Sequence, residues 1–177
     1  MNRQKIILLL INIIGGIAVI GSYVYGLNAQ SAGTSVLWGG VPQNIQPVYA
    51  VSMVLSAIGY FAFLYYLLFK VNPSQVKISG EFGYSLFYWI FAGILVPSAF
   101  WMPLTNIYIE NPVILNWVLI RLVLFLVGLA SLMLVLAIYK TSPDTKGIPR
   151  PAAIAGSIYF TFHTLILDAI VWAELFD

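Results

Sequence analysis

Five long apolar runs, separated by shorter polar stretches, dominate the chain. They span residues 6–27, 48–69, 82–105, 113–139 and 152–176. About 20 apolar residues in helical form are needed to cross ~30 Å of hydrocarbon, and each run reaches that length. The pattern therefore predicts an all-α fold, an integral membrane bundle of five transmembrane helices, with residues 1–177 forming a single domain.

Composition agrees with this pattern. Hydrophobic residues make up 61% of the 177 positions and charged residues 8%, too few polar groups to cover a soluble globule of this size. The net charge of +2 gives no reason to expect nucleic acid as a partner. The chain has no cysteine, which excludes disulfides, thiolate catalysis and cysteine-ligated metal sites.

Basic residues fall on one side of the predicted bundle. With five spans, the N-terminus and the second and fourth loops share a side, which holds Arg3, Lys5, Lys70, Lys77, Lys140, Lys146 and Arg150. The other side carries the acidic residues Glu110, Glu174 and Asp177. The positive-inside rule then places the N-terminus in the cytoplasm and the C-terminus on the opposite side.

Ionisable residues lie deep in the last two runs. Arg121 lies ~10 Å inside the start of the fourth run, and Asp168 lies ~12 Å inside the end of the fifth, at the helical rise per residue. Because consecutive spans are antiparallel and a lone charge in hydrocarbon is costly, we predict an intramembrane ion pair between Arg121 and Asp168. His163 lies about 140° around an α-helix from Asp168, so the two are not expected to share a face.

Two further features concern helix packing. Pro97 and Pro103 in the third run predict a kinked or broken helix end, which is one way for a bundle to open a cavity. In the first run Ala18, Ser22 and Gly26 recur every four residues. This small-residue stripe suits either a dimer seam or, as we favour, packing within the chain.

Short motifs resemble the TspO family, the tryptophan-rich sensory proteins and mitochondrial translocator proteins. Residues 98–104, SAFWMPL, look like the family's third-helix pattern of asparagine, two small residues, tryptophan, any residue, proline and leucine. Residues 38–42, WGGVP, echo its tryptophan-containing first loop, and Tyr159, Phe162 and Trp172 are similar to the aromatic rhythm of its last helix. The chain departs from the family at Gln43, where a second proline is usual, at Ser98 in place of asparagine, and in lacking a tryptophan in the second run.

The resemblance implies a pocket under the first loop that binds a flat apolar ligand of the tetrapyrrole or sterol class, in a receptor, carrier or sensor. We predict that its ligand-binding residues are Trp38, Tyr60, Ser98, Trp101 and His163. No metal site, nucleophilic triad or phosphate loop is present in the sequence, and a tetrapyrrole enters as a candidate ligand rather than as a resident cofactor.

Two other functions stay open. One is a small accessory subunit of a larger membrane complex, in which partner chains would cover the aromatic faces. The other, which we favour least, is an enzyme acting on a lipid through His163 and Asp168. The expected partners are the lipid bilayer and a small apolar ligand, with a second copy of the chain or a larger membrane complex also open.

Overall fold

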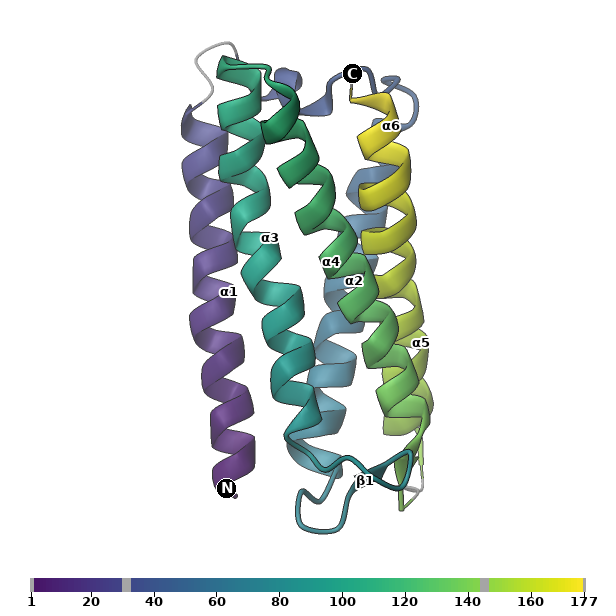
Figure 1. Cartoon of the computed structure of the whole chain (residues 1–177). Coiled ribbons are helices and arrows are strands. Elements are labelled where there is room, and N and C mark those ends of the chain that lie inside the picture. Colours follow the sequence, from purple (N-terminus) through teal and green to yellow (C-terminus); the bar gives the residue numbers. More distant parts are fainter. Residues whose placement is uncertain (1, 30–32, 144–146, 177) are drawn as a thin grey trace.

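The computed structural model describes residues 2–29, 33–143 and 147–176. The helices are α1 (Arg3–Ala29), η1 (Thr34–Trp38), α2 (Gln46–Tyr65), η2 (Tyr66–Lys70), α3 (Leu86–Glu110), α4 (Ile114–Tyr139), α5 (Pro149–Thr161), η3 (Phe162–Trp172) and α6 (Ala173–Leu175). The strands β1 (Lys77–Ile78) and β2 (Thr141–Ser142) form a short antiparallel pair. Five helical segments are long and apolar enough to cross a membrane, which confirms the predicted all-α fold with five such helices (Figure 1).

Two of the five segments are composite. Helix η2 continues α2 without interruption, so the second segment runs over Gln46–Lys70. In the same way η3 and α6 continue α5, and the fifth segment runs over Pro149–Leu175. Prolines stand in the first turns of α2 and α5, where the missing backbone N–H leaves no hydrogen bond unmade. The helix starts therefore follow directly from local sequence.

The helices form a ring that is open at one place. Helix α3 packs between α1 and α4, α4 packs on α5 and η3, and α5 packs on α2. The remaining pair of neighbours, α1 and α2, share little packing along their length. A hydrogen bond from the hydroxyl of Tyr60 on α2 to the side-chain oxygen of Asn12 on α1 connects them.

Two apolar cores lie at different heights. The larger, near the N-terminal end, contains Leu8, Phe63, Tyr66 and Phe87, and the smaller, near η1 and α6, contains Tyr49, Trp117, Trp172 and Phe176. Trp117 and Phe176 stack with their ring planes 18° apart at a centroid distance of 5.7 Å. The candidate functional site lies between these two cores.

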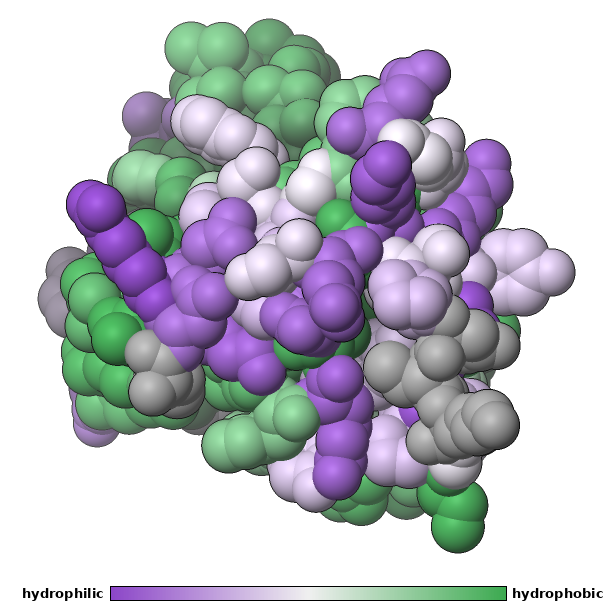
Figure 2. All heavy atoms as spheres, turned by 90° about the horizontal axis from the view of Figure 1, so that it is seen from below, coloured by the Kyte–Doolittle hydropathy of each residue, from purple (hydrophilic) through white to green (hydrophobic). Residues whose placement is uncertain are grey.

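The N-terminus, β1 and β2 lie at the same end of the bundle (Figure 1). The β1–β2 pair joins the second and fourth loops there, with Lys77 opposite Ser142 and Ile78 opposite Thr141. Figure 2 views this end and shows hydrophilic residues gathered across it, with hydrophobic side chains around the rim. Of the residues used to predict orientation, Lys146 and Asp177 lie outside the described part of the chain.

The prolines do not break the third helix. Helix α3 is continuous through both Pro97 and Pro103, so of the predicted kink or break the break is wrong, and the kink stays a prediction. Nearby hydroxyls supply hydrogen bonds to the backbone, from Ser98 Oγ to the oxygen of Ile94 and from Thr105 Oγ1 to the oxygen of Trp101. These bonds do not replace the donors that the prolines remove, because the carbonyls four residues before Pro97 and Pro103 are those of Gly93 and Ala99.

Two glycines of the first helix, Gly15 and Gly26, pack within the chain. A Cβ built on Gly26 would lie 2.0 Å from Met102 Cγ, and one built on Gly15 would lie 2.7 Å from Leu95 Cδ1, both on α3. Two glycines of α1 thus allow close approach of α3 inside one molecule. This supports the internal-packing interpretation of the stripe over a dimer seam.

Helices α2 and α5 make a close backbone contact that the sequence did not predict. A Cβ at Gly59 would lie 2.6 Å from the backbone oxygen of Gly156, and a Cβ at Gly156 would lie 2.8 Å from Gly59 Cα. Backbone atoms cannot rotate away as a flexible side chain can. The two helices therefore need glycine at both positions.

We expect Gly59→Ala or Gly156→Ala to lower the free energy of unfolding by about 1–3 kcal/mol, the usual cost of overpacking. Thermal unfolding of the purified protein in detergent measures this. Gly21→Ala is the control, because a Cβ there meets nothing within 4 Å and alanine has the higher helix propensity. Equal midpoints for all three variants would contradict the assigned α2–α5 contact.

Candidate functional site

A cavity of about 670 Å³ lies inside the ring, and all five long helical segments contribute to it. Its walls are apolar for the most part, with Leu9, Ile13, Ile17, Leu64, Ile94, Leu95, Leu124, Val127 and Phe160 among them. Its volume falls within the roughly 300–1,000 Å³ typical of small-molecule sites. Residues of both apolar cores reach it, so the cavity occupies the gap between them.

Four of the five residues predicted to bind a ligand line this cavity. They are Tyr60 on α2, Ser98 and Trp101 on α3, and His163 on η3. Residues from three separate segments of the sequence are thereby brought to one site.

The fifth predicted residue, Trp38, does not line the cavity. Its ring packs edge-on against Tyr49 at 5.8 Å, within the smaller aromatic core. The first loop is held there by a hydrogen bond from Trp172 Nε1 to the backbone oxygen of Leu37. Trp38 therefore covers the aromatic core next to the cavity rather than touching its interior.

The cavity opens sideways between α1 and α2. Its lining includes Ile17 and Ile20 of α1 and Met53 and Phe61 of α2, all of which are also exposed on the outer surface. These side chains form apolar lips on both sides of the opening. The hydrogen bond between Asn12 and Tyr60 links the two helices, and both residues also line the cavity.

The winding of η3 decides how His163 and Asp168 are arranged. This segment is a π-helix of 11 residues, in which backbone hydrogen bonds join residues five apart. Residues i and i+5 consequently lie on the same side of the helix, and His163 Nε2 lies 3.7 Å from Asp168 Oδ2. The expectation that these residues point to different faces was wrong because it assumed α-helical geometry.

Long π-helical stretches are rare and are frequently found at functional sites. Here the neighbouring helix supports the wide turns, since the hydroxyl of Tyr49 donates a 2.9 Å hydrogen bond to the backbone oxygen of Leu167. Both His163 and Asp168 line the cavity. The unusual winding therefore coincides with the polar part of the candidate site.

A chain of hydrogen bonds fixes the histidine ring. Tyr159 donates to Ser52 Oγ at 3.3 Å, and Ser52 Oγ lies 3.0 Å from His163 Nδ1. Because Ser52 already accepts a hydrogen bond, its own hydrogen is free to be donated to Nδ1. This network favours the neutral tautomer with its proton on Nε2, which faces Asp168.

The predicted pair between Arg121 and Asp168 is not formed. Arg121 Nη2 instead donates to the backbone oxygen of Ala173 at 3.0 Å and pairs with Glu174. The guanidinium also lies over the ring of Trp117, 5.2 Å from its centroid. The prediction compared the depths of Arg121 and Asp168 in their helices and left out the length of the arginine side chain. That side chain extends toward the end of the bundle and binds the carboxylate of Glu174 there.

The predicted site residues left out four polar residues that line the cavity, namely Asn12, Tyr23, Ser56 and Thr164. Asn12 could have been found, since it is the one amide side chain in residues 6–27 and a polar residue within an apolar span normally faces the protein interior. Tyr23 and Ser56 carry no such signal, because tyrosine and serine also occur on outer faces of this chain. Their place depends on how the helices pack.

The described residues contain no group of three or more histidine, cysteine, aspartate or glutamate side chains suited to a metal ion. Comparisons with protein-family models, with curated proteins and with solved structures find no match to this chain. The resemblance to the TspO family thus stays a prediction, and the function has to be argued from the cavity itself.

The assigned tautomer can be measured directly because His163 is the single histidine of the chain. At a pH where the ring is neutral, ¹⁵N NMR of the labelled protein should report the Nε2–H tautomer. Ser52→Ala removes the donor to Nδ1 and should raise the Nδ1–H population. Ser56→Ala, a buried serine on the same helix, serves as the control and should leave the tautomer unchanged. A predominantly Nδ1–H ring in the wild-type protein would contradict the network.

Proposed function

We propose that this chain is a membrane receptor, carrier or sensor that binds a flat apolar ligand, of the tetrapyrrole or sterol class, between its helices. The observation that carries the proposal is the cavity of about 670 Å³ with Tyr60, Ser98, Trp101 and His163 in its walls. An apolar pocket with a few polar groups converging on it is the usual form of a small-molecule site.

The aromatic lining suits a flat ligand. Trp101 lies edge-on to Tyr23 with a centroid distance of 5.5 Å, and both residues line the cavity. Contact between aromatic rings adds about 0.5–1.5 kcal/mol per pair beyond the burial of apolar area. The imidazole of His163 and the hydroxyl of Tyr60 are polar groups able to fix a ligand's orientation.

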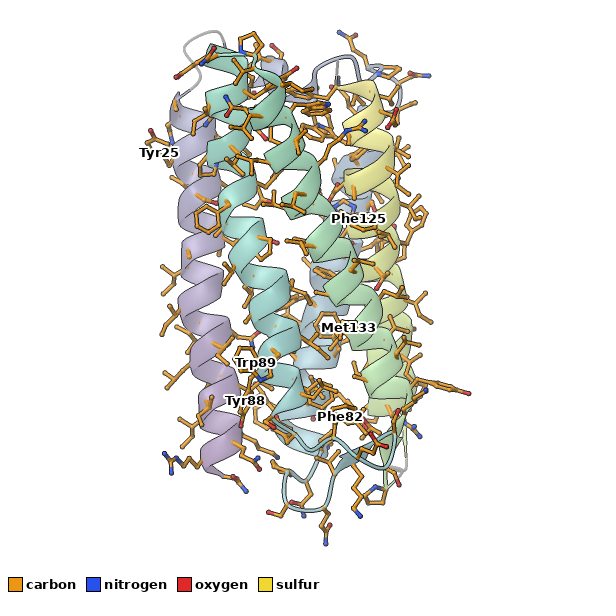
Figure 3. The ribbon with its side chains drawn as sticks, viewed as in Figure 1. Tyr25, Phe82, Tyr88, Trp89, Phe125 and Met133 are labelled. Carbon is orange, nitrogen blue, oxygen red and sulfur yellow. The ribbon has the colours of Figure 1, made fainter. Side chains whose placement is uncertain are left out.

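The proposal includes insertion of the five long helices in a bilayer. Large apolar side chains are exposed along the outside of the bundle, among them Tyr25, Phe125 and Met133, which Figure 3 labels on its outer faces. Trp89, labelled in Figure 3 on the part of α3 nearer its start, is 78% exposed, as an interfacial anchor would be. In such a setting the opening between α1 and α2 would face hydrocarbon and give a lipid-soluble ligand a direct route to the cavity.

We further propose that the N-terminus is cytoplasmic, from the basic residues gathered at that end. The chain has no native cysteine, so single introduced cysteines report their side without background. In intact cells, an impermeant maleimide should label Ser35→Cys in the first loop. It should label Ser74→Cys in the second loop only after permeabilisation. The reverse pattern would show that the orientation is inverted.

A large side chain placed in the cavity should weaken ligand binding. Gly16 lines the cavity and a Cβ there meets nothing within 4 Å, so Gly16→Trp can place a large ring at the mouth without displacing backbone. We expect it to weaken saturable binding of protoporphyrin or cholesterol by tenfold or more. Tryptophan quenching for the porphyrin and displacement of a fluorescent sterol for cholesterol provide the measurements.

Gly21→Trp is the matched control. It lies on the same helix, its Cβ position is equally open, and it is not among the cavity residues. It should bind as the wild-type protein does. If the wild-type protein binds neither compound, or if the two variants bind alike, the cavity is not the ligand site.

A further inference from the structure

The carboxylate of Asp168 stands at the cavity without a hydrogen-bond partner among the described residues. Its side chain is 27% exposed, and it lines the cavity. The nearest positive or potentially positive group is His163 Nε2 at 3.7 Å, which is beyond hydrogen-bond distance. A carboxylate inside an apolar site is costly unless a cation or hydrogen-bond donors compensate for the water it has lost.

The basic residue that could have compensated Asp168 is engaged elsewhere. Arg121 is the basic residue that lies well inside a long helix, away from the bundle's basic end, and its guanidinium binds Glu174 and the backbone oxygen of Ala173. His163 is held through Nδ1 by Ser52, which leaves one ring nitrogen for Asp168 at most. The described part of the chain therefore supplies no full countercharge to this carboxylate.

Aromatic rings also line the cavity. Tyr23 is close enough to Asp168 to interact with it electrostatically, and the ring of Trp101 meets that of Tyr23 edge to face. A carboxylate beside tryptophan and tyrosine is the combination that binds organic ammonium groups, because the ring faces and the carboxylate both attract positive charge. Two buried polar atoms at the cavity, Trp101 Nε1 and Ser56 Oγ, also lack partners among the described residues and can hydrogen-bond the ligand.

We propose that the ligand carries a protonated amine at one end of its flat apolar body and that this amine binds Asp168, next to Trp101 and Tyr23. This inference rests on the proposed ligand-binding function and narrows its ligand class. An anionic group, such as the carboxylates of many tetrapyrroles, would be repelled by Asp168. A neutral hydroxyl would gain a hydrogen bond but not the charge interaction.

Three steroids with one skeleton test this, namely the 3-amino, the 3-acetamido and the 3-hydroxy compound. Each is titrated against the purified wild-type protein in lipid nanodiscs by displacement of a fluorescent sterol. We expect the amine to bind about 10–100-fold more tightly than either neutral compound, the range for a hydrogen bond between charged groups. This comparison needs no variant, so it does not depend on whether a substituted protein folds.

The variant Asp168→Asn keeps the size of the side chain and removes its charge. It should remove most of the 10–100-fold preference for the amine and change the affinities of the two neutral steroids far less. Glu174→Gln is the matched control, since this carboxylate pairs with Arg121 and is not a cavity residue. It should retain the preference for the amine.

The outcomes separate this inference from the proposed function. If all three steroids bind the wild-type protein with equal affinity, the cavity binds ligands but the amine proposal is overturned. A preference for the amine that persists in Asp168→Asn also overturns it. If no steroid binds and protoporphyrin does not bind either, the proposed function fails and the amine proposal fails with it.

Discussion

The i to i+5 winding of η3 is the constraint on which the candidate site depends. In an α-helix His163 and Asp168 would point in directions about 140° apart, and one of them would leave the cavity. In the π-helix both line it, 3.7 Å from each other. The wide turns also present the backbone oxygen of Leu167 to Tyr49. The π-helical geometry thus positions His163 and Asp168 and also allows the hydrogen bond between Tyr49 of α2 and Leu167 of η3.

The cavity exists because the ring of helices is packed unevenly. Glycines allow the backbones of α2 and α5 to touch at Gly59 and Gly156, and α1 fits against α3 at Gly15 and Gly26. The helices α1 and α2 have no equivalent contact with each other, and the hydrogen bond from Tyr60 to Asn12 spans the gap between them. Tight packing on four sides of the ring therefore leaves space at the fifth.

Two ion pairs among the described residues lie in different surroundings. The pair of Arg121 and Glu174 is at the α6 end, with side chains 42% and 65% exposed, where it also engages the backbone oxygen of Ala173. Exposed pairs of this kind contribute little to stability. The pair of His163 and Asp168 is enclosed by helices, and its carboxylate has no second partner among the residues that the structure describes. This difference is why we propose a ligand-binding role for the second pair and no such role for the first.

The sequence by itself determined the helical architecture. Five apolar runs of at least 20 residues, separated by polar stretches, allow few alternatives to five long helices, because the pattern is local and strong. It also indicated four of the residues that line the cavity, Tyr60, Ser98, Trp101 and His163. The tertiary structure decided the rest. Whether η3 winds as an α- or a π-helix depends on its neighbours, and so does the meeting of Gly59 with Gly156. The partner of Arg121 was equally undetermined, because a long flexible side chain can reach several carboxylates and only the packed bundle shows which one is nearest.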